Sequence, residues 1–378
     1  MVPHAPQESR DLPLQHKGNT WDWRIYHKWS ERAGQVHPFR HAELGIVDRD
    51  SRFFCMGSCF ADHVAEYLQE VLGITASSFH ESRFYDTASV LQAVRHLLDG
   101  PQYDWSEMWR TDTGRFAHPF RNHHFRADTL AELQAWSELI ERDARAAIRA
   151  ADFVVITLGG TETWRDPLTK KTFLTMPMPD VFNTLHPGGH VEFHNLDFAE
   201  NYSNLEQIFL TIREHAPTTQ VIYTVSPIRM TFTVSGKDVA VATNQSKSVL
   251  RAAVGELVDR YGSDGLHYFH SYEVIQYAGS GAHFFDRDDI HVSSLGVRTV
   301  MHEFARCYVQ EAARGPEYAL EEAALEGAGS VAGVDELTPY LTKAEAVRRA
   351  RRWAVRLLRT FGLERLARTL LRRSVASN

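Results

Sequence analysis

The sequence predicts an α/β fold in which a mostly parallel sheet lies between layers of helices. Three observations lead to this prediction: short apolar runs alternate with amphipathic helical segments, several runs are apolar throughout, and glycine or proline follows them. Strands that alternate with helices form crossover units, and strands without polar positions are typical of parallel sheets. With 378 residues, 43% of them apolar and 24% charged, the chain has an ordinary globular composition.

The apolar runs define the predicted strands, and apolar residues at helical spacing define the predicted helices. The strands are expected over residues 52–56, 74–79, 152–158, 220–225 and 266–269. The helices are expected over about 62–72, 89–98, 128–150, 202–215, 245–261 and 294–310. Thr129 or Asp128 suits the N-cap of the third of these helices. The segment 161–198 contains several prolines and glycines and is expected to be a loop.

Glycine, serine and proline mark the carboxyl ends of three strands, at Gly57–Cys59, Gly159–Thr161 and Ser226–Pro227. A loop that carries Asp288 and His291 follows the last strand. In parallel sheets the carboxyl ends of the strands meet at one edge, and ligands bind in the crevice beyond it. We therefore expect these residues to gather at one active site.

The turn after the first strand is the best candidate for a nucleophile. Ser58 and Cys59 lie between a strand and a predicted helix, so the free N–H groups of the helix start face them. Such a position lowers the pKa of a thiol, whereas a serine there needs a base. His291 can supply that base, and Asp288, three residues earlier, can orient it.

The stretch Gly57-Ser58-Cys59-Phe60-Ala61 resembles the signature of the GSCFA family, a branch of the SGNH/GDSL hydrolase superfamily. Agreement continues, in the family's order, at residues 157–161, 223–229, 244–250, 268–273 and 286–291. The resemblance implies a three-layer α/β/α, flavodoxin-like domain of the SGNH hydrolase type. It also implies a catalytic Asp-x-x-His motif at Asp288–His291 and acyl-ester chemistry, without fixing the substrate.

The nucleophile has two candidates in this turn. The superfamily's Gly-Asp-Ser pattern, laid on Gly57-Ser58-Cys59 without a gap, puts Cys59 in the place of the nucleophile. A shift by one residue makes Ser58 the nucleophile instead. We favour Cys59, because this register needs no gap and a helix start suits a thiolate. A third interpretation is structural: Cys59 packs inward and Ser58 caps the helix.

The oxyanion site departs from the superfamily pattern. Ser82 stands where the resemblance leads us to expect a glycine, and Thr161 stands where an asparagine is expected. Backbone N–H groups of Ser82 and near Cys59 and Gly160, together with the Thr161 hydroxyl, are the expected donors. Gly159 belongs to the same predicted strand end.

Three further residues are expected to line the substrate cleft: Glu162, Trp164 and His186. No metal or cofactor is predicted. His118, His123 and His124 have no recognised ligand spacing, and the aspartates at 286, 288 and 289 lack the glycine and glutamate of a calcium loop.

Composition divides the chain into four predicted regions. Residues 1–48 form an aromatic N-terminal arm that packs on the body, and 49–314 form the catalytic domain. An acidic, Ala/Gly-rich stretch over 315–340 is expected to be a linker. Residues 341–378 are expected to form a basic amphipathic helix.

The net charge of −7 excludes general nucleic-acid affinity but hides an uneven distribution. Residues 343–373 carry eleven Lys/Arg and two acids, about +9, so the remainder carries about −16. This tail is expected either to lie on an anionic membrane surface or to dock on the acidic body or a protein partner. Three cysteines and no apolar run of ~18 residues predict a cytoplasmic protein, with a peripheral position on the inner membrane face if the tail binds lipid.

The predicted function is acyl-ester hydrolysis or acyl transfer, with an O-acyl group on a glycan or similar small polar molecule as the substrate. The rival interpretation is a non-catalytic binding protein on a hydrolase scaffold, recruited to a membrane assembly by its basic tail.

Overall fold

The computed structural model describes residues 16–17, 20–21, 44–79, 82–121, 125–174, 191–277 and 284–327. Its centre is a five-stranded sheet whose neighbouring strands all run parallel, which confirms the predicted α/β class. The strands are β3 (Arg52–Gly57), β4 (Thr75–Ser78), β8 (Phe153–Leu158), β12 (Gln220–Val225) and β13 (Leu266–Phe269). Their order is β4-β3-β8-β12-β13, or 2-1-3-4-5 along the chain, which is the flavodoxin-like order.

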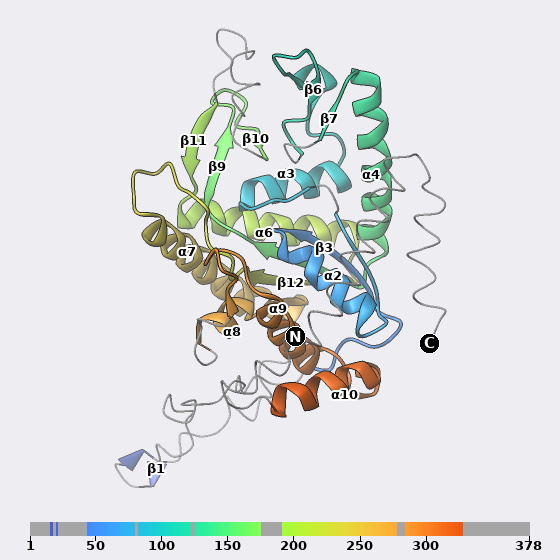
Figure 1. The fold of residues 1–378 in the computed structure, drawn as a ribbon, viewed down its shortest axis with the longest axis vertical. Coiled ribbons are helices and arrows are strands. Elements are labelled where there is room, and N and C mark those ends of the chain that lie inside the picture. Colours follow the sequence, from blue (N-terminus) through green and yellow to red (C-terminus); the bar gives the residue numbers. More distant parts are fainter. Residues whose placement is uncertain are drawn as a thin grey trace.

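Helices cover both faces of this sheet, as can be followed in Figure 1, and the alternation of strand side chains decides which helices each residue meets. On β3, Phe53 and Cys55 belong to one apolar cluster, and Phe54 and Met56 belong to another. The first cluster includes α2 (Phe60–Glu70) and α9 (Ser294–Tyr308). The second includes α3 (Thr87–Leu98), α4 (Leu130–Ala150), α6 (Phe198–His215) and α7 (Val239–Tyr261). The described core is therefore a three-layer α/β/α sandwich.

Side-chain caps fix where the helices begin. Thr129 caps α4 in a capping box with Glu132, so of the two predicted caps it is Thr129 that acts. Helix α6 begins four residues before its predicted start at 202, because Asp197 caps it. Helix α7 begins six residues before its predicted start at 245, because the Asp238 carboxylate accepts a hydrogen bond from the Ala240 N–H.

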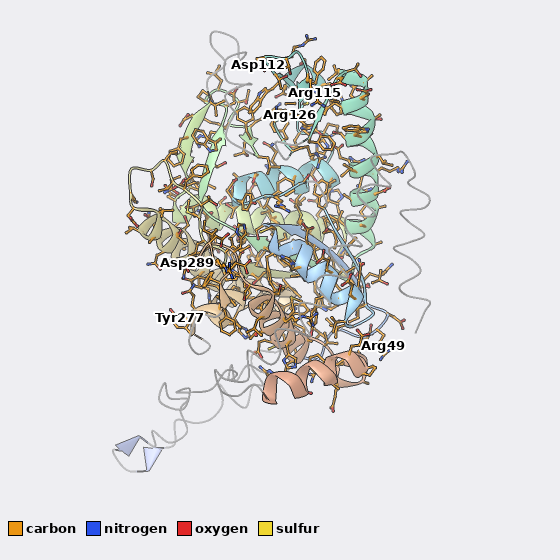
Figure 2. The ribbon with its side chains drawn as sticks, in the orientation of Figure 1. Arg49, Asp112, Arg115, Arg126, Tyr277 and Asp289 are labelled. Carbon is orange, nitrogen blue, oxygen red and sulfur yellow. The ribbon has the colours of Figure 1, made fainter. Side chains whose placement is uncertain are left out.

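Two small antiparallel sheets extend the body beyond α3. One contains β9 (Glu162–Arg165), β10 (Thr172–Phe173) and β11 (Glu192–Asn195); the other contains β5 (Trp109–Arg110), β6 (Phe116–Ala117) and β7 (Arg126–Ala127). The expectation that 161–198 is a loop was therefore wrong at three places, because Trp164 pairs with aromatic residues on both neighbouring strands. Residues 175–190, which hold most of the prolines, lie outside the described residues. Figure 2 shows Asp112, Arg115 and Arg126 grouped around the second small sheet, apart from Asp289.

The two ends of the chain lie largely outside the described residues. Of the predicted N-terminal arm, the structure describes residues 44–48 and a short antiparallel pair, β1 (His16–Lys17) and β2 (Thr20–Trp21). The later part of the predicted linker and the whole basic tail, residues 328–378, are not described. Among the described helices, none combines the length and the apolar character that a membrane span requires.

The start of the predicted linker is a helix rather than an irregular segment. Helix α10 (Glu311–Gly327) contains a kink where Gly315 adopts φ 74° and Pro316 starts the next helical stretch. Tyr318 is buried after the kink, and its ring stacks on His302 of α9 with centroids 4.4 Å apart. Alanine and glutamate favour a helix wherever one apolar face can dock, which explains the difference from the sequence prediction.

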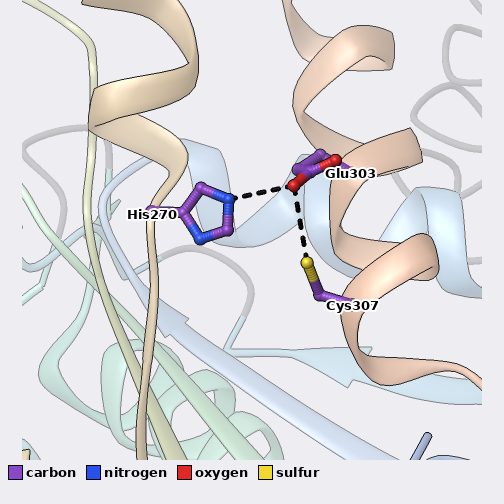
Figure 3. Close-up of side chains that lie close together, drawn as sticks. All are labelled: His270, Glu303 and Cys307. Carbon is purple, nitrogen blue, oxygen red and sulfur yellow. Dashed lines mark hydrogen bonds and ion pairs between the residues drawn. The ribbon is translucent and has the colours of Figure 1, made fainter. Parts of the chain in front are cut away.

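A buried charge cluster joins α9 to the end of β13. Glu303 is 2% exposed, and its carboxylate binds both Arg306, at 2.6 and 2.8 Å, and His270, at 3.1 Å. The Cys307 thiol contacts Glu303 Oε1, the oxygen atom that His270 also contacts, at 3.5 Å (Figure 3). Burial raises the pKa of Glu303, but the hydrogen bonds and charges of Arg306 and His270 outweigh burial and lower this pKa to about 2.

The turn after β3 requires a glycine. Gly57 has φ +118°, and a Cβ atom there would lie 2.2 Å from the carbonyl oxygen of Thr157 on the adjacent strand β8. The close approach allows the N–H of Ser58 to donate to that same oxygen at 2.9 Å. The direction in which the chain enters α2 therefore depends on the missing side chain.

We expect Gly57→Ala to lower the free energy of unfolding by about 2–5 kcal/mol, the sum of a left-handed backbone penalty and a steric overlap. Gly73→Ala is the matched control, because Gly73 has φ +66° but no atom within 4 Å of the added Cβ. It should cost only about 1–2 kcal/mol. Urea unfolding of both variants measures the difference. Equal losses of unfolding free energy in the two variants would contradict the close approach of β3 to β8.

We expect Glu303→Gln to lower the free energy of unfolding by about 3–5 kcal/mol at pH 7, because Arg306 and His270 lose a buried counter-charge. The pKa of Glu303 is lowered in the folded protein, so its contribution is fully present above the ordinary value of 4.5 and fades as the pH falls towards 2. The gap between parent and variant should therefore narrow between pH 5 and pH 3. Glu317→Gln, at an exposed position of α10, is the control. A difference in unfolding free energy between the parent and Glu303→Gln that does not change with pH would refute the ion pair.

Candidate active site

The carboxyl ends of the central strands form one continuous edge, as the sequence predicted. Backbone hydrogen bonds join the ends directly: Ser58 N donates to Thr157 O at 2.9 Å, and Ser226 N donates to Leu158 O at 2.8 Å. The turn after β3 therefore adjoins the end of β8, and the end of β8 adjoins the end of β12.

Ser58 faces inward at this edge. It is 3% exposed, and its hydroxyl lies 2.9 Å from the hydroxyl of Thr157. The Thr157 hydroxyl also contacts the Ser58 carbonyl oxygen at 3.3 Å, and the Phe60 N–H contacts the Ser58 hydroxyl at 3.4 Å. The Ser58 hydroxyl is thus engaged in holding the turn and the start of α2 to strand β8.

Cys59 occupies the N-cap position of α2, and its thiol is free and partly exposed. Burial raises the pKa of this thiol. Of the charges around it, those of Arg83 and Lys247 lower the pKa, whereas that of Asp62 raises it. Burial outweighs the positive charges, so the pKa of Cys59 lies above the ordinary value of a thiol, contrary to the lowering predicted for a helix start.

Asp288 and His291 form the predicted pair. Their side chains are joined by a hydrogen bond of 2.6 Å between Asp288 Oδ2 and His291 Nδ1. Asp288 also accepts the N–H groups of Ile290 and His291, and these bonds, the His291 ring first, lower the pKa of Asp288 to about 2. The carboxylate therefore remains ionised and fixes the orientation of the ring.

The loop that carries this pair is held by a residue that follows β12. Arg229 donates from its guanidinium to the carbonyl oxygen of Asp289 at 3.0 Å and stacks over the ring of Phe285 at 4.0 Å. In the part of the chain that the structure describes, no hydrogen bond joins the His291 ring to Cys59 or Ser58, and the ring is more than half exposed. Both side chains of the pair are exposed to solvent.

The expected oxyanion donors after β8 are already in use, which corrects the prediction. The N–H groups of Gly159 and Gly160 both donate to the carbonyl oxygen of Tyr85, at 2.9 and 2.7 Å. The Thr161 hydroxyl is buried, donates to Asn195 Oδ1 at 2.6 Å and lies 2.9 Å from the Ser246 hydroxyl. In this structure these groups stabilise the strand end instead of facing a substrate.

Ser82 also differs from its expected role. Its hydroxyl is buried and accepts a hydrogen bond of 2.8 Å from Arg121, and its N–H contacts the Phe79 carbonyl oxygen at 3.3 Å. Arg121 forms a buried ion pair with Glu141 and borders a small pocket lined also by Phe84 and His96. Ser82 therefore connects the segment before α3 to an inner charge network.

The three residues expected to line the cleft lie in different environments. Glu162 accepts a hydrogen bond from the Thr233 hydroxyl, beside the segment that precedes α7. Trp164 packs on Phe193 within the small sheet, with ring centroids 5.5 Å apart. His186 lies outside the described residues.

Lys247 belongs to the site, although no role was predicted for it. It is 1% exposed on α7, and its ammonium group donates to the carbonyl oxygen of Gly159. Burial lowers its pKa to about 7, while Cys59 has the opposite, raising effect. Its helical register is the signal that could have identified it, because Leu250, Val254 and Leu257 follow at spacings of three, seven and ten and are all buried.

One group of described residues offers donors of the kind that bind metals. The ligand atoms of His270, Glu303 and Cys307 lie within 4.8 Å of one another. Arg306, however, forms an ion pair with Glu303 and contacts the Cys307 sulfur at 3.5 Å, so a guanidinium already supplies the positive charge there. No metal was expected at the three histidines of the loop before α4. His118 is buried, and burial is the main cause of its lowered pKa. His123 and His124 lie outside the described residues.

Solved structures supply distant likenesses. A protein from Parabacteroides merdae named as a GDSL-like lipase is 11% identical, with a TM-score of 0.35, over 70% of this chain and 98% of its own. A salicylyl-acyltransferase from a tetracycline biosynthetic pathway is 13% identical, with a TM-score of 0.31, over 69% of this chain and 54% of its own. An acetyl xylan esterase from the rumen bacterium Butyrivibrio proteoclasticus is 11% identical, with a TM-score of 0.27, over 59% of this chain and 56% of its own.

Curated proteins give no match to this sequence. The model of the GSCFA family, in contrast, matches residues 52–304, which is more than half of the chain and includes all five strands of the central sheet. The matched region also includes both Cys59 and the Asp288–His291 pair. The chain therefore belongs to the GSCFA family.

Proposed function

We propose that the protein is an acyl-transfer enzyme in which Cys59 is the nucleophile and the Asp288–His291 pair handles the proton of the leaving or accepting group. The observation that carries the proposal is the position of Cys59, a partly exposed thiol at the start of α2, on the edge that joins the strand ends. Ser58 is the weaker candidate, because its hydroxyl is buried and engaged with Thr157.

The chemistry follows from these positions. As the Cys59 sulfur attacks the acyl carbonyl carbon, its S–H proton passes to His291, and the N–H groups at the start of α2 face the oxyanion that forms. His291 protonates the leaving oxygen and then removes a proton from water or from an acceptor hydroxyl that attacks the thioester. Asp288 keeps the ring oriented and balances its positive charge.

The proposed substrate is an O-acyl group on a glycan or a similar small polar molecule, on the analogy of the SGNH superfamily. Hydrolysis and transfer use the same acyl-enzyme and differ in the group that attacks it. A transferase has to keep water from the thioester, so the ratio of the two products distinguishes them.

A second candidate function has support from one observation. The expected oxyanion donors of Gly160 and Thr161 are bonded to Tyr85 and Asn195, and their loss is what a non-catalytic binding protein on a hydrolase scaffold would show. Residues 343–373, the basic tail, would recruit such a protein to an anionic membrane or an acidic partner. Co-sedimentation with anionic vesicles, for the full chain and for a chain that ends at Val334, tests this recruitment.

We expect iodoacetamide and activated acyl esters to modify Cys59 in the parent, as located by mass spectrometry of its peptide. Cys59→Ala should lose the adduct and lower ester turnover at least 100-fold, because the bond-forming atom is missing. Ser58→Ala should retain the adduct. An acyl adduct and turnover that survive Cys59→Ala would refute the thiol mechanism, and their loss only in Ser58→Ala would assign the nucleophile to Ser58.

We expect Asp288→Asn to lower ester turnover by roughly 10²–10⁴, because an amide can neither balance the imidazolium nor fix the same ring tautomer. Asp286→Asn is the matched control, since Asp286 lies in the same loop and is ionisable and exposed. Turnover of the control should stay within about twofold of the parent. Equal loss in both variants would point to a disturbed loop rather than to the proposed pair.

A further inference from the structure

The Asp288–His291 pair lies at the tip of a hairpin, residues 285–292, that backbone contacts close. Phe285 and Val292 form an antiparallel bridge, and the Asp286 N–H donates to the carbonyl oxygen of His291 at 2.8 Å. The side chains of the pair are 45% and 58% exposed, so their own burial cannot hold them in place. The position of the pair relative to the central sheet therefore depends on what binds the hairpin.

Arg229 binds the hairpin at its tip and at its base. Its backbone N–H donates to the carbonyl oxygen of Ile290 at 3.2 Å. Its guanidinium donates to the carbonyl oxygen of Asp289 at 3.0 Å, forms an ion pair with the Asp289 carboxylate, and lies over the ring of Phe285 at 4.0 Å. The two residues that separate Asp288 from His291 are thus both bonded to Arg229.

The segment that carries Arg229 is itself fixed to the body of the protein. Ser226, directly after β12, is fully buried, and its N–H donates to the carbonyl oxygen of Leu158 at 2.8 Å. Met230 donates its N–H to the hydroxyl of Thr243 on α7 at 3.2 Å. Arg229 lies between these two anchored points, so a hairpin bound to it takes its position from the end of β12.

The contacts of Arg229 suit arginine in particular and concern geometry more than stability. A planar guanidinium stacks on a ring while it donates along fixed directions, and the ammonium group of a lysine has neither property. The side chains of Arg229 and Asp289 are 37% and 77% exposed, and ion pairs at such exposure add little to the stability of a fold. Loss of Arg229 is therefore expected to loosen the hairpin and to leave the fold intact.

We propose that Arg229 is a positioning residue for the Asp288–His291 pair. It holds the hairpin at the end of β12, so that the imidazole keeps one orientation at the edge of the sheet. Arg229 acts through Asp289, Ile290 and Phe285 and takes no part in the proton transfers. The inference rests on the proposed role of the pair in acyl transfer.

Hydrogen exchange of the full chain, followed by mass spectrometry, tests whether Arg229 holds the hairpin. In Arg229→Met the protection of the hairpin amides should fall about fivefold, because the hairpin opens more often. Turnover of an activated acyl ester should fall about tenfold or more, because the imidazole is misplaced. Arg287→Met is the matched control, since Arg287 is an exposed arginine of the same hairpin, and it should change neither quantity by more than about twofold.

A double variant separates positioning of the pair from a merely structural role. In a chain that already carries Asp288→Asn, the pair that Arg229 positions is lost. Adding Arg229→Met to that chain should therefore lower turnover by no more than about a further twofold. Losses that multiply would show that Arg229 acts independently of the pair and would overturn the inference.

Arg229→Gln is the second variant, because it retains an N–H donor for the Asp289 carbonyl oxygen without the charge or the stacking. It should show the same two losses, and it decides the matter if Arg229→Met does not fold, as judged by circular dichroism. Unchanged hairpin protection in a folded Arg229 variant would overturn the inference, as would unchanged turnover in a variant whose hairpin is loosened. Failure of the proposed function is distinct, since Asp288→Asn would then retain ester turnover while Arg229→Met still loosens the hairpin.

Discussion

The close approach of β3 to β8 at Gly57 is the constraint on which the site depends. A side chain at this position would overlap the Thr157 carbonyl oxygen, so glycine alone lets the two strand ends come together. The same carbonyl oxygen then receives the Ser58 N–H, and α2 begins two residues later. Because the turn is this tight, Cys59 is presented at the helix start and not within the sheet.

Around this turn the polar groups of the strand ends mostly bind one another. The hydroxyls of Ser58 and Thr157 pair, Thr161 bridges to Asn195, and Tyr85 accepts two N–H groups. A satisfied network of this kind is rigid, since each group would lose a buried partner on moving. Within the described residues, the Cys59 thiol makes no hydrogen bond to another side chain, and this distinguishes it from its neighbours.

Much of the architecture could be predicted from the sequence, because it rests on periodicity. The apolar run at 152–158 and the helix capped by Thr129 are long and strongly patterned, and both are found as expected. The hydrogen bond between Asp288 and His291 could be predicted as well, since three residues of spacing suffice to bring the side chains together.

The features that could not be predicted depend on contacts between distant segments. The Gly160 N–H is not free because it donates to the carbonyl oxygen of Tyr85. The Thr161 hydroxyl likewise donates to the side chain of Asn195. A lysine in a helix is normally exposed, so Lys247 was overlooked although it shares a helical face with Leu250, Val254 and Leu257. The small sheets have strands of two to four residues, too short for a clear period.

The bond between Arg121 and Ser82 links two parts of the molecule that are far apart in sequence. Ser82 precedes Arg83, whose positive charge lowers the pKa of the Cys59 thiol. Arg121 belongs to the segment between α3 and α4 and is fixed there by Glu141. The segment that holds Arg121 therefore helps to fix the chain next to Arg83, and through Arg83 it is connected to the charges around the Cys59 thiol.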